Sequence, residues 1–200
     1  MKTQILTIAT VLSLALASST ATFAANKNIS KVSTTLTDVK HINKIEVRGN
    51  VELYVSNGTT DNVKVYDKYY SENALVQNQN GVLRISSYKT EKLVVWVTAA
   101  ELQSISAYDN ATVKSFGELS GINLDVNLYN HAVANLKLDA YTANINVNDQ
   151  AAADLTGTVT NCNLKHNQSA TVNSTNFVAD NLIRTVSFEG FNKAEQVAGL

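Results

Sequence analysis

Between Leu102 and Val172 the chain alternates apolar and polar residues in short runs, and a polar corner ends each run. Alternation with a period of two is typical of a β-strand that buries one face. The corners are Tyr108-Asp109-Asn110, Tyr129-Asn130-His131, Asn148-Asp149-Gln150 and, one residue looser, His166-Asn167-Gln168. The last apolar residues before them, Ala107, Leu128, Val147 and Leu164, are separated by 21, 19 and 17 residues. A period near 20 predicts stacked strand repeats.

The apolar positions of successive repeats define the expected interior. They are Ile122, Leu124, Val126 and Leu128, then Ala132, Ala134, Leu136 and Leu138, then Ala143, Ile145 and Val147, then Ala151, Ala153 and Leu155, then Cys162, Leu164, Ala170 and Val172. One repeat cannot bury its apolar face alone, whereas copies stacked at roughly 4.8 Å cover it. We therefore expect an all-β fold, a right-handed parallel β-helix (β-solenoid) with rungs of about 20 residues.

The small residue after each corner, Ala or Ser, lets the sheet bend sharply without crowding the interior. The corner side chains would then stack along one outer edge, where Asn amides can share hydrogen bonds between layers. The residues expected in this ladder are Asp109, Asn130, Asp149 and Asn167.

Longer mixed strands are expected before the repeats. The runs 45–47 and 51–55 alternate on either side of a corner at Gly49-Asn50. Asn57-Gly58 predicts a tight turn towards a partner strand that begins at Val63, and Asn80-Gly81 predicts a turn into 82–85. The run 93–97 is apolar on both faces, which predicts cover on both sides.

Residues 68–80 are the least regular part of the chain after residue 40. Tyr69, Tyr70, Leu75 and Val76 are expected to form a short helical turn or a cap over the end of the stack. At the other end, Leu182, Ile183, Val186 and Phe188 continue the strand pattern. Phe191 and the tail 193–197 are the candidates for closing that end, because an uncapped rung exposes an edge that invites aggregation.

The first 24 residues read as a signal peptide. Lys2 supplies a positive start, residues 5–17 form an apolar run too short to span a bilayer comfortably, and Thr22-Phe23-Ala24 predicts cleavage after Ala24. The alternative is a buried N-terminal helix. Residues 25–40 form a polar lead-in, either a strand or a flexible arm, and residues 41–200 form a single domain without a transmembrane segment. The expected location is periplasmic, cell-surface or secreted.

The charge balance excludes some partners. Sixteen Lys and Arg against 17 Asp and Glu leave no basic field for nucleic acid. The chain has no proline, as suits stacked strands in which every backbone N–H pairs. Its single cysteine, Cys162, alternates in phase with Leu164 and is expected to be a small core residue.

Residues with catalytic or metal-binding side chains are scattered. His41, His131 and His166 lack partners at metal-ligand spacing, so we expect no metal and no cofactor, and calcium at the Asp and Asn corners stays open. The outward carboxylates, which could support a glycosidase or lyase, are Asp109, Asp125, Asp139, Asp149 and Asp154. Asp109 and Asp149, two rungs apart, lie near the upper limit for an acid/base pair. We assign no catalytic residue.

The aromatic residues gather ahead of the repeats. Tyr66, Tyr69, Tyr70, Tyr88 and Trp96 lie there. Among Asn and Gln they could form a platform for sugar or peptide, or they could cover the first rung of the stack.

The stretches INKIEVRGNVELYVSNG, NVKVY and NQNGVLRIS, followed by the corner repeats, resemble the putative auto-transporter adhesin head GIN domain family from about Ile42 onward. The family's corners usually read Ser-Gly-Ala/Ser, whereas this chain has Asp109-Asn110, Asn130-His131 and Asp149-Gln150. The resemblance implies a β-helical fold and a cell-envelope or extracellular location, and it carries no catalytic residues.

These observations together predict a non-catalytic, adhesin-like binding or structural module. The expected partner is a glycan or another envelope protein, met by a long, flat, amide-rich face. The alternatives are a polysaccharide-active enzyme on the same scaffold and a purely structural spacer.

Overall fold

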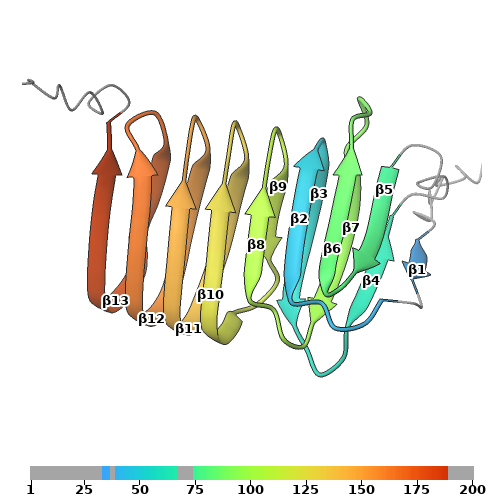
Figure 1. Cartoon of the computed structure of the whole chain (residues 1–200), viewed down its shortest axis with the longest axis horizontal. Helices are drawn as coiled ribbons and strands as arrows, with labels where there is room; N and C mark the ends of the chain where they lie inside the picture. Colours follow the sequence, from blue (N-terminus) through green and yellow to red (C-terminus); the bar gives the residue numbers. More distant parts are fainter. Residues whose placement is uncertain (1–32, 37–38, 67–73, 189–200) are drawn as a thin grey trace, which may run out of the picture. The chain divides into compact units, whose positions relative to one another are not determined.

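The computed structural model describes residues 33–36, 39–66 and 74–188, all within the compact unit Lys31–Leu200. The described residues form thirteen strands and no helix, which confirms the all-β prediction (Figure 1). The strands are β1 Thr34–Leu36, β2 Lys44–Gly49, β3 Val51–Asn57, β4 Asn62–Val65, β5 Ala74–Gln79, β6 Val82–Ser87, β7 Leu93–Ala99, β8 Ser104–Ala107, β9 Thr112–Ser115, β10 Leu119–Leu128, β11 Val133–Val147, β12 Ala152–Asn167 and β13 Thr171–Ser187.

All thirteen strands belong to one strongly curled mixed sheet. The pairs β1–β4, β4–β7 and β5–β6 are antiparallel, and the other pairs are parallel. Antiparallel strands thus occur ahead of the repeats, where longer mixed strands were expected. From β8 onward every pair is parallel.

The sheet has two walls. The first wall consists of β5, β6, β2 and β8 and continues into the later parts of β10 to β13. The second wall consists of β1, β4, β7, β3 and β9 and continues into the early parts of β11 to β13. Each long strand from β11 onward bends midway and contributes to both walls (Figure 1). β11 and β12 have paired strands on both sides, whereas β13 pairs only with β12 among the described strands.

The core lies between the walls and is built from rows of apolar side chains. Val126, Ile145 and Leu164 are register partners in β10, β11 and β12, and each is at most 1% exposed. Leu164 therefore follows Ile145, and the expected 17-residue step from Val147 is wrong. Val147 instead pairs with His166 in β12. The rung keeps its length because β12 runs on to Asn167 before it turns.

Ile122 was expected in the interior, but the residue is 75% exposed. It lies in β10 beside the residues of β11 where the chain bends between the walls. Leu119 and Leu124 are both buried although they are five positions apart, an odd number, so the alternation slips by one residue in the bend. Sequence periodicity cannot anticipate such a slip.

Three of the four corners share one conformation. Asp109, Asn130 and Asp149 have φ angles of 61°, 60° and 58°, a left-handed backbone that Asn and Asp tolerate better than most residues. At the fourth corner, Asn167 is 6% exposed, and its Oδ1 accepts a hydrogen bond from the backbone N–H of Ala170 at 2.9 Å. Asn167 therefore supports its own turn from within, and its expected place in the outer ladder is wrong.

The first half of the chain departs from prediction in its pairing. β4 pairs with β7 and β1 and not with β3, because β7 lies between β3 and β4. Residues 74–79 form strand β5, and no helical turn occurs there. The turn at Asn80-Gly81, with φ angles of 52° and 80°, joins β5 to β6 as predicted.

The strand β7 is covered on one side only. Leu93, Val95 and Val97 are buried, whereas Val94 and Trp96 on the outer side are half-buried. The prediction that both faces of this strand are covered is therefore wrong. The outer residues of the strand contribute to a surface cluster described below.

At the ends, β1 shows that part of the polar lead-in forms a strand. In β13 and just after it, Val178, Leu182, Ile183, Val186 and Phe188 are exposed. The expected signal peptide 1–24, Tyr69, Tyr70, Phe191 and the tail 193–197 lie outside the described residues. Among the residues that the structure describes, no helix has the length and apolarity needed to cross a membrane.

Candidate binding faces

The outer side of the first wall carries rows of asparagine, which we call the amide face. Asn144 Nδ2 donates to Asp125 Oδ1 at 2.8 Å, and Asn163 Nδ2 donates to Asn144 Oδ1 at 2.9 Å. A second row joins Asn146 Nδ2 to Asn127 Oδ1 at 2.9 Å. These residues are register partners in β10, β11 and β12, so the parallel stack places each amide over the next.

The ladder bonds give the amide face a fixed geometry. A primary amide has two N–H donors, and each ladder bond uses one of them. The second donor and the remaining oxygen lone pairs stay available to a ligand. Asp125 and Asn163 are exposed, and Asn144 is half-buried. The face is therefore a rigid array of donors and acceptors at strand spacing.

On the same side of the first wall, β2 and β6 carry charged residues beyond the amide face. Lys44 Nζ lies 3.0 Å from Glu46 Oε1, and Arg84 Nε lies 3.3 Å from Glu46 Oε2. The hydrogen bond from Lys44 is the main cause that lowers the pKa of Glu46, and the charges of Arg84 and Arg48 add to it. Glu46 is therefore ionised at neutral pH and holds two cations in place.

The corner residues line a shallow groove of about 380 Å³ that includes Asp109, Asn130 and Asp149. Asn130 Nδ2 donates to Asp109 Oδ1 at 3.0 Å, and the backbone N–H of Asn130 donates to Asp149 Oδ2 at 2.7 Å. The predicted ladder thus forms among these three residues. Both carboxylates are engaged by the asparagine between them, and this arrangement supports the corners.

His131 and His166 have separate partners. His131 Nε2 lies 2.9 Å from Gln150 Oε1 at the neighbouring corner, and His166 Nδ1 lies 2.9 Å from the backbone oxygen of Asn167. Within ranges 33–36, 39–66 and 74–188, no group of three or more His, Cys, Asp or Glu side chains is arranged to hold a metal ion.

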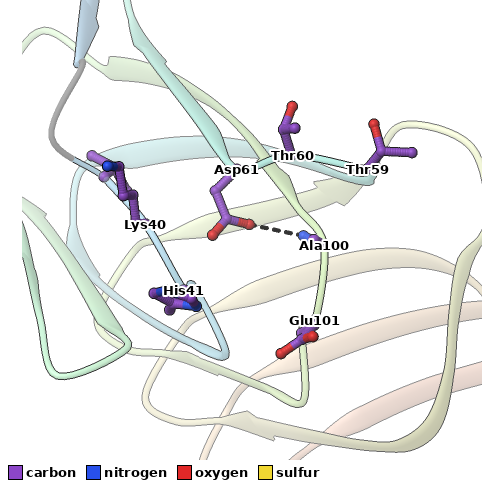
Figure 2. A pocket seen from close by; sticks show the side chains of 8 residues that line it. Lys40, His41, Thr59, Thr60, Asp61, Ala100 and Glu101 are labelled. Atoms are coloured by element: carbon purple, nitrogen blue, oxygen red, sulfur yellow. Dashed lines mark hydrogen bonds between the residues drawn. The ribbon is translucent and has the colours of Figure 1, made fainter.

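A pocket of about 460 Å³ lies among loops at the base of the first strands, and Figure 2 shows its lining. Asp61 accepts hydrogen bonds from the backbone N–H of Ala100 through Oδ1 and from that of Ile42 through Oδ2, both at 2.9 Å. The Asp61 carboxylate therefore ties two loops together. Lys40, His41 and Glu101 also line the pocket. The sequence did not indicate this pocket, because its residues come from three separate segments.

The outer side of the second wall carries an aromatic cluster, which we call the aromatic platform: Tyr54, Tyr66, Trp96 and Phe116. Tyr54 and Trp96 are register partners in β3 and β7, and their rings stack at 4.7 Å with an interplanar angle of 20°. Phe116 is tilted by 55° at 5.2 Å from Trp96, and Tyr66 meets Trp96 edge-on at 6.3 Å. These arrangements are those that aromatic pairs prefer.

A polar group adjoins the aromatic platform. Lys114 Nζ lies 2.6 Å from Glu52 Oε1, and the Tyr54 hydroxyl donates to the same oxygen at 2.8 Å. The hydrogen bond from Lys114 lowers the pKa of Glu52 most, and that from Tyr54 comes next. The same ion pair raises the pKa of Lys114. The carboxylate is therefore ionised, and its position beside the rings is fixed.

The predicted aromatic set is thus partly right. Tyr66 and Trp96 meet, whereas the Tyr88 hydroxyl donates to Asp109 Oδ2 at 3.2 Å on the corner edge. Sequence analysis missed Tyr54 and Phe116. A usable signal existed for Tyr54, because it occupies the outer phase of its strand just as Trp96 does.

Cys162 is the small core residue that its pattern predicted. It is 1% exposed, and burial raises the pKa of its thiol to about 11. A protonated thiol is a poor nucleophile, so Cys162 is not expected to be reactive in the folded protein.

Comparison with known proteins identifies relatives of this fold. No curated protein matches the chain in sequence. A putative adhesin from Bacteroides fragilis superposes with a TM-score of 0.69 at 17% identity, over 78% of this chain and 76% of that one. A putative adhesin from Parabacteroides merdae gives 0.65 at 14% identity, over 78% and 77%. A protein described as a putative lipid binding protein from Parabacteroides distasonis gives 0.61 at 9% identity, over 78% of each chain.

These structural likenesses, all at low identity, show a shared fold. Family membership rests on the sequence model described as putative auto-transporter adhesin, head GIN domain, which matches residues 41–198. That range is most of the chain and contains strands β2 to β13, with the amide face and the aromatic platform. The chain therefore belongs to the putative auto-transporter adhesin, head GIN domain family.

Proposed function

We propose that this protein is an exported, non-catalytic, adhesin-like module that binds a glycan at the cell envelope. Membership of the adhesin head family supports a binding role. The apolar run 5–17 and the small residues before position 25 support export, with cleavage after Ala24 and a periplasmic, cell-surface or secreted location.

The amide ladder carries this proposal. Asn144 bridges Asp125 and Asn163 across three consecutive strands with bonds of 2.8 and 2.9 Å. Sugar hydroxyls both donate and accept hydrogen bonds, so they match a surface that offers amide N–H and C=O groups at regular spacing. Because the ladder holds the side chains in place, a ligand orders few of them on binding, and that saves conformational entropy.

The scaffold that we propose for this face is a right-handed parallel β-helix with rungs of about 20 residues. The parallel steps of 19 residues from Leu128 to Val147 and from Val147 to His166 support it. Stacked rungs extend a face in one direction, and such a surface suits a long polymer better than a small molecule.

The rival function is a polysaccharide-active enzyme on the same scaffold, and the corner carboxylates would be its candidate catalytic residues. Asp109 and Asp149 both accept hydrogen bonds from Asn130, and this supports a structural role for them. A binding partner that is another envelope protein is the other alternative.

The test is a glycan array probed with the chain from Ala25 onward, run beside a reducing-sugar release assay on the same glycans. We expect saturable binding without release of sugar ends, and Asp109→Ala and Asp149→Ala should leave binding unchanged. Asn146→Ala should weaken it, because Asn146 lies in the second amide row. Release of sugar ends that those Asp replacements abolish would establish the enzyme. Failure of every glycan, with capture of an envelope protein, would replace the glycan by a protein partner.

A further inference from the structure

We propose that the aromatic platform is a second, separate sugar site, which takes a pyranose ring of a glycan chain against Phe116. This proposal takes only the class of ligand from the proposed function, because the aromatic platform lies on the second wall, whereas the amide face lies on the first. The site consists of the platform residues together with Glu52 and Lys114.

The aromatic platform is not part of the core. Its central residue, Trp96, stands between Val95 and Val97, whose side chains point inward and are at most 1% exposed. Trp96 itself is half-buried on the outer side, and Phe116 is 62% exposed. The exposed ring of Phe116, next to three half-buried aromatic rings, leaves apolar surface in water, and exposed apolar patches can mark binding sites.

The rings hold one another in place. Stacking between Tyr54 and Trp96 across neighbouring strands makes a firm base, and Phe116 packs against Trp96. Phe116 is exposed, whereas the other three rings are half-buried, so Phe116 offers the contact surface. One face of a pyranose presents C–H groups in a nearly flat patch, and an aromatic ring is a matching apolar surface.

Hydrogen-bonding groups beside the rings favour a sugar over an apolar peptide. The Glu52 carboxylate has two oxygens, and Lys114 and Tyr54 both engage Oε1. Its second oxygen, Oε2, can accept hydrogen bonds from sugar hydroxyls, and the ammonium of Lys114 can donate to others. Apolar surface next to a few fixed polar groups is the usual make-up of a specific ligand site.

The row that contains the platform continues along the stack. Trp96 pairs with Tyr54, Tyr54 with Lys114, and Lys114 with Asn135, one residue for each strand. Asn135 pairs in turn with Asp154, whose Oδ1 accepts a hydrogen bond from Asn173 at 3.2 Å. A glycan chain that leaves the rings therefore meets polar side chains at each following strand, which favours an oligosaccharide over a single sugar.

Trp96 provides a direct readout, because it is the only tryptophan of the chain. The chain from Ala25 onward is titrated with a β-1,4-linked glucose hexamer and a β-1,4-linked galactose hexamer while Trp96 fluorescence is recorded. We expect a saturable change with at least one of them. Phe116→Ala should raise the dissociation constant about tenfold, the size expected for loss of one aromatic contact.

The chain offers a matched control in Phe188, which is 62% exposed, as is Phe116, and lies just beyond β13. Phe188→Ala should leave the dissociation constant unchanged. Asn146→Ala on the amide face should also leave the Trp96 signal unchanged. Because Phe116 is mostly exposed, its replacement should fold normally, which the unfolding midpoint in urea checks.

The other outcomes overturn the inference. Equal dissociation constants for Phe116→Ala and Phe188→Ala would show that the rings do not bind sugar. Glycan binding that only Asn146→Ala weakens would leave the amide face as the sole site and the proposed function intact. A fluorescence change with a proline-rich peptide and with neither hexamer would make the platform a peptide site. No fluorescence change together with no binding on the array would overturn the site and the proposed function alike.

Discussion

Leu128 of β10 and Val147 of β11 are direct partners in a parallel pair, and both side chains are fully buried. The residues just before them, Asn127 and Asn146, are also partners and join their amides on the outer side. One step of 19 residues thus places apolar over apolar inside and amide over amide outside.

Asn144→Ala should lower the free energy of unfolding by about 1–2 kcal/mol, because Asn144 loses a hydrogen bond to each neighbour in the ladder. Urea unfolding measures the change. The control is Asn135→Ala, an exposed asparagine of the same strand, which should cost less than about 0.5 kcal/mol. Equal costs would mean that the ladder contributes no stability.

Gly157→Ala should destabilise the protein by about 2 kcal/mol or more, because its φ of 96° is strained for any side chain and a Cβ would lie 2.1 Å from the Leu138 oxygen. Gly121→Ala is the control, since the nearest atom to its Cβ would be 3.8 Å away. Thermal and urea unfolding should separate the two variants. A tolerated alanine at 157 would contradict the close approach of β12 to β11.

Asn130→Ala should cost more than Asn130→Gly. Both lose the side-chain bond to Asp109, but only alanine also pays for the left-handed backbone at φ 60°, about 1–2 kcal/mol. The difference in unfolding free energy between the two variants isolates the corner conformation. Equal stabilities would show that the corner relaxes without its left-handed residue.

Lys114→Gln should reduce stability at neutral pH by less than about 1 kcal/mol, since the pair with Glu52 is partly exposed. The folded pKa of Glu52 lies below its usual 4.5, so the pair's contribution is present above that value and is lost as the pH falls through the folded pKa. The difference between wild type and variant should therefore vanish in acid. Unfolding free energies measured in steps from pH 7 downward test this, and a difference that does not shrink as the pH falls would contradict the pairing with Glu52.

Cys162 should resist a thiol reagent at pH 8 in the folded protein and react fully in denaturant. Burial both excludes the reagent and raises the thiol pKa to about 11, so little thiolate exists at that pH. Absorbance of the released chromophore measures the reaction. A cysteine placed at an exposed corner by Ser169→Cys should react at once and serves as the positive control. Prompt reaction of Cys162 would mean that β13 opens readily from β12.

Local patterns predicted much of the repeat half. The alternation in residues 132–138 correctly assigned every buried position there, since side chains of a strand must point to opposite sides. The corner residues Asp109, Asn130 and Asp149 were also found, because few residue types other than Gly, Asn and Asp tolerate a left-handed backbone. Ile122 was wrongly placed in the interior because the alternation slips in the bend of β10. Asn167 was wrongly placed on the outer edge because β12 extends as far as this residue.

The binding faces were less predictable. An amide-rich face was predicted, because the repeat period places the outward asparagines of successive strands next to one another. The aromatic platform was not assembled correctly, because Tyr54 and Trp96 meet only when β7 lies next to β3, and Lys114 reaches Glu52 only when β9 lies on the other side of β3. Strand order is a property of the whole sheet and leaves no mark in the pattern of a single strand.

Away from the bend at Ile122 and the turn at Asn167, the sequence alone determined which side chains of the repeats face inward and where the chain turns, since both depend on backbone geometry within a few residues. Only the tertiary structure decided which outward side chains become neighbours. Glu52 and Lys114 are 62 residues apart, yet their charged atoms lie 2.6 Å apart. Their contact depends on strand order and register, which hydrogen bonding between distant segments and burial of the shared core select together.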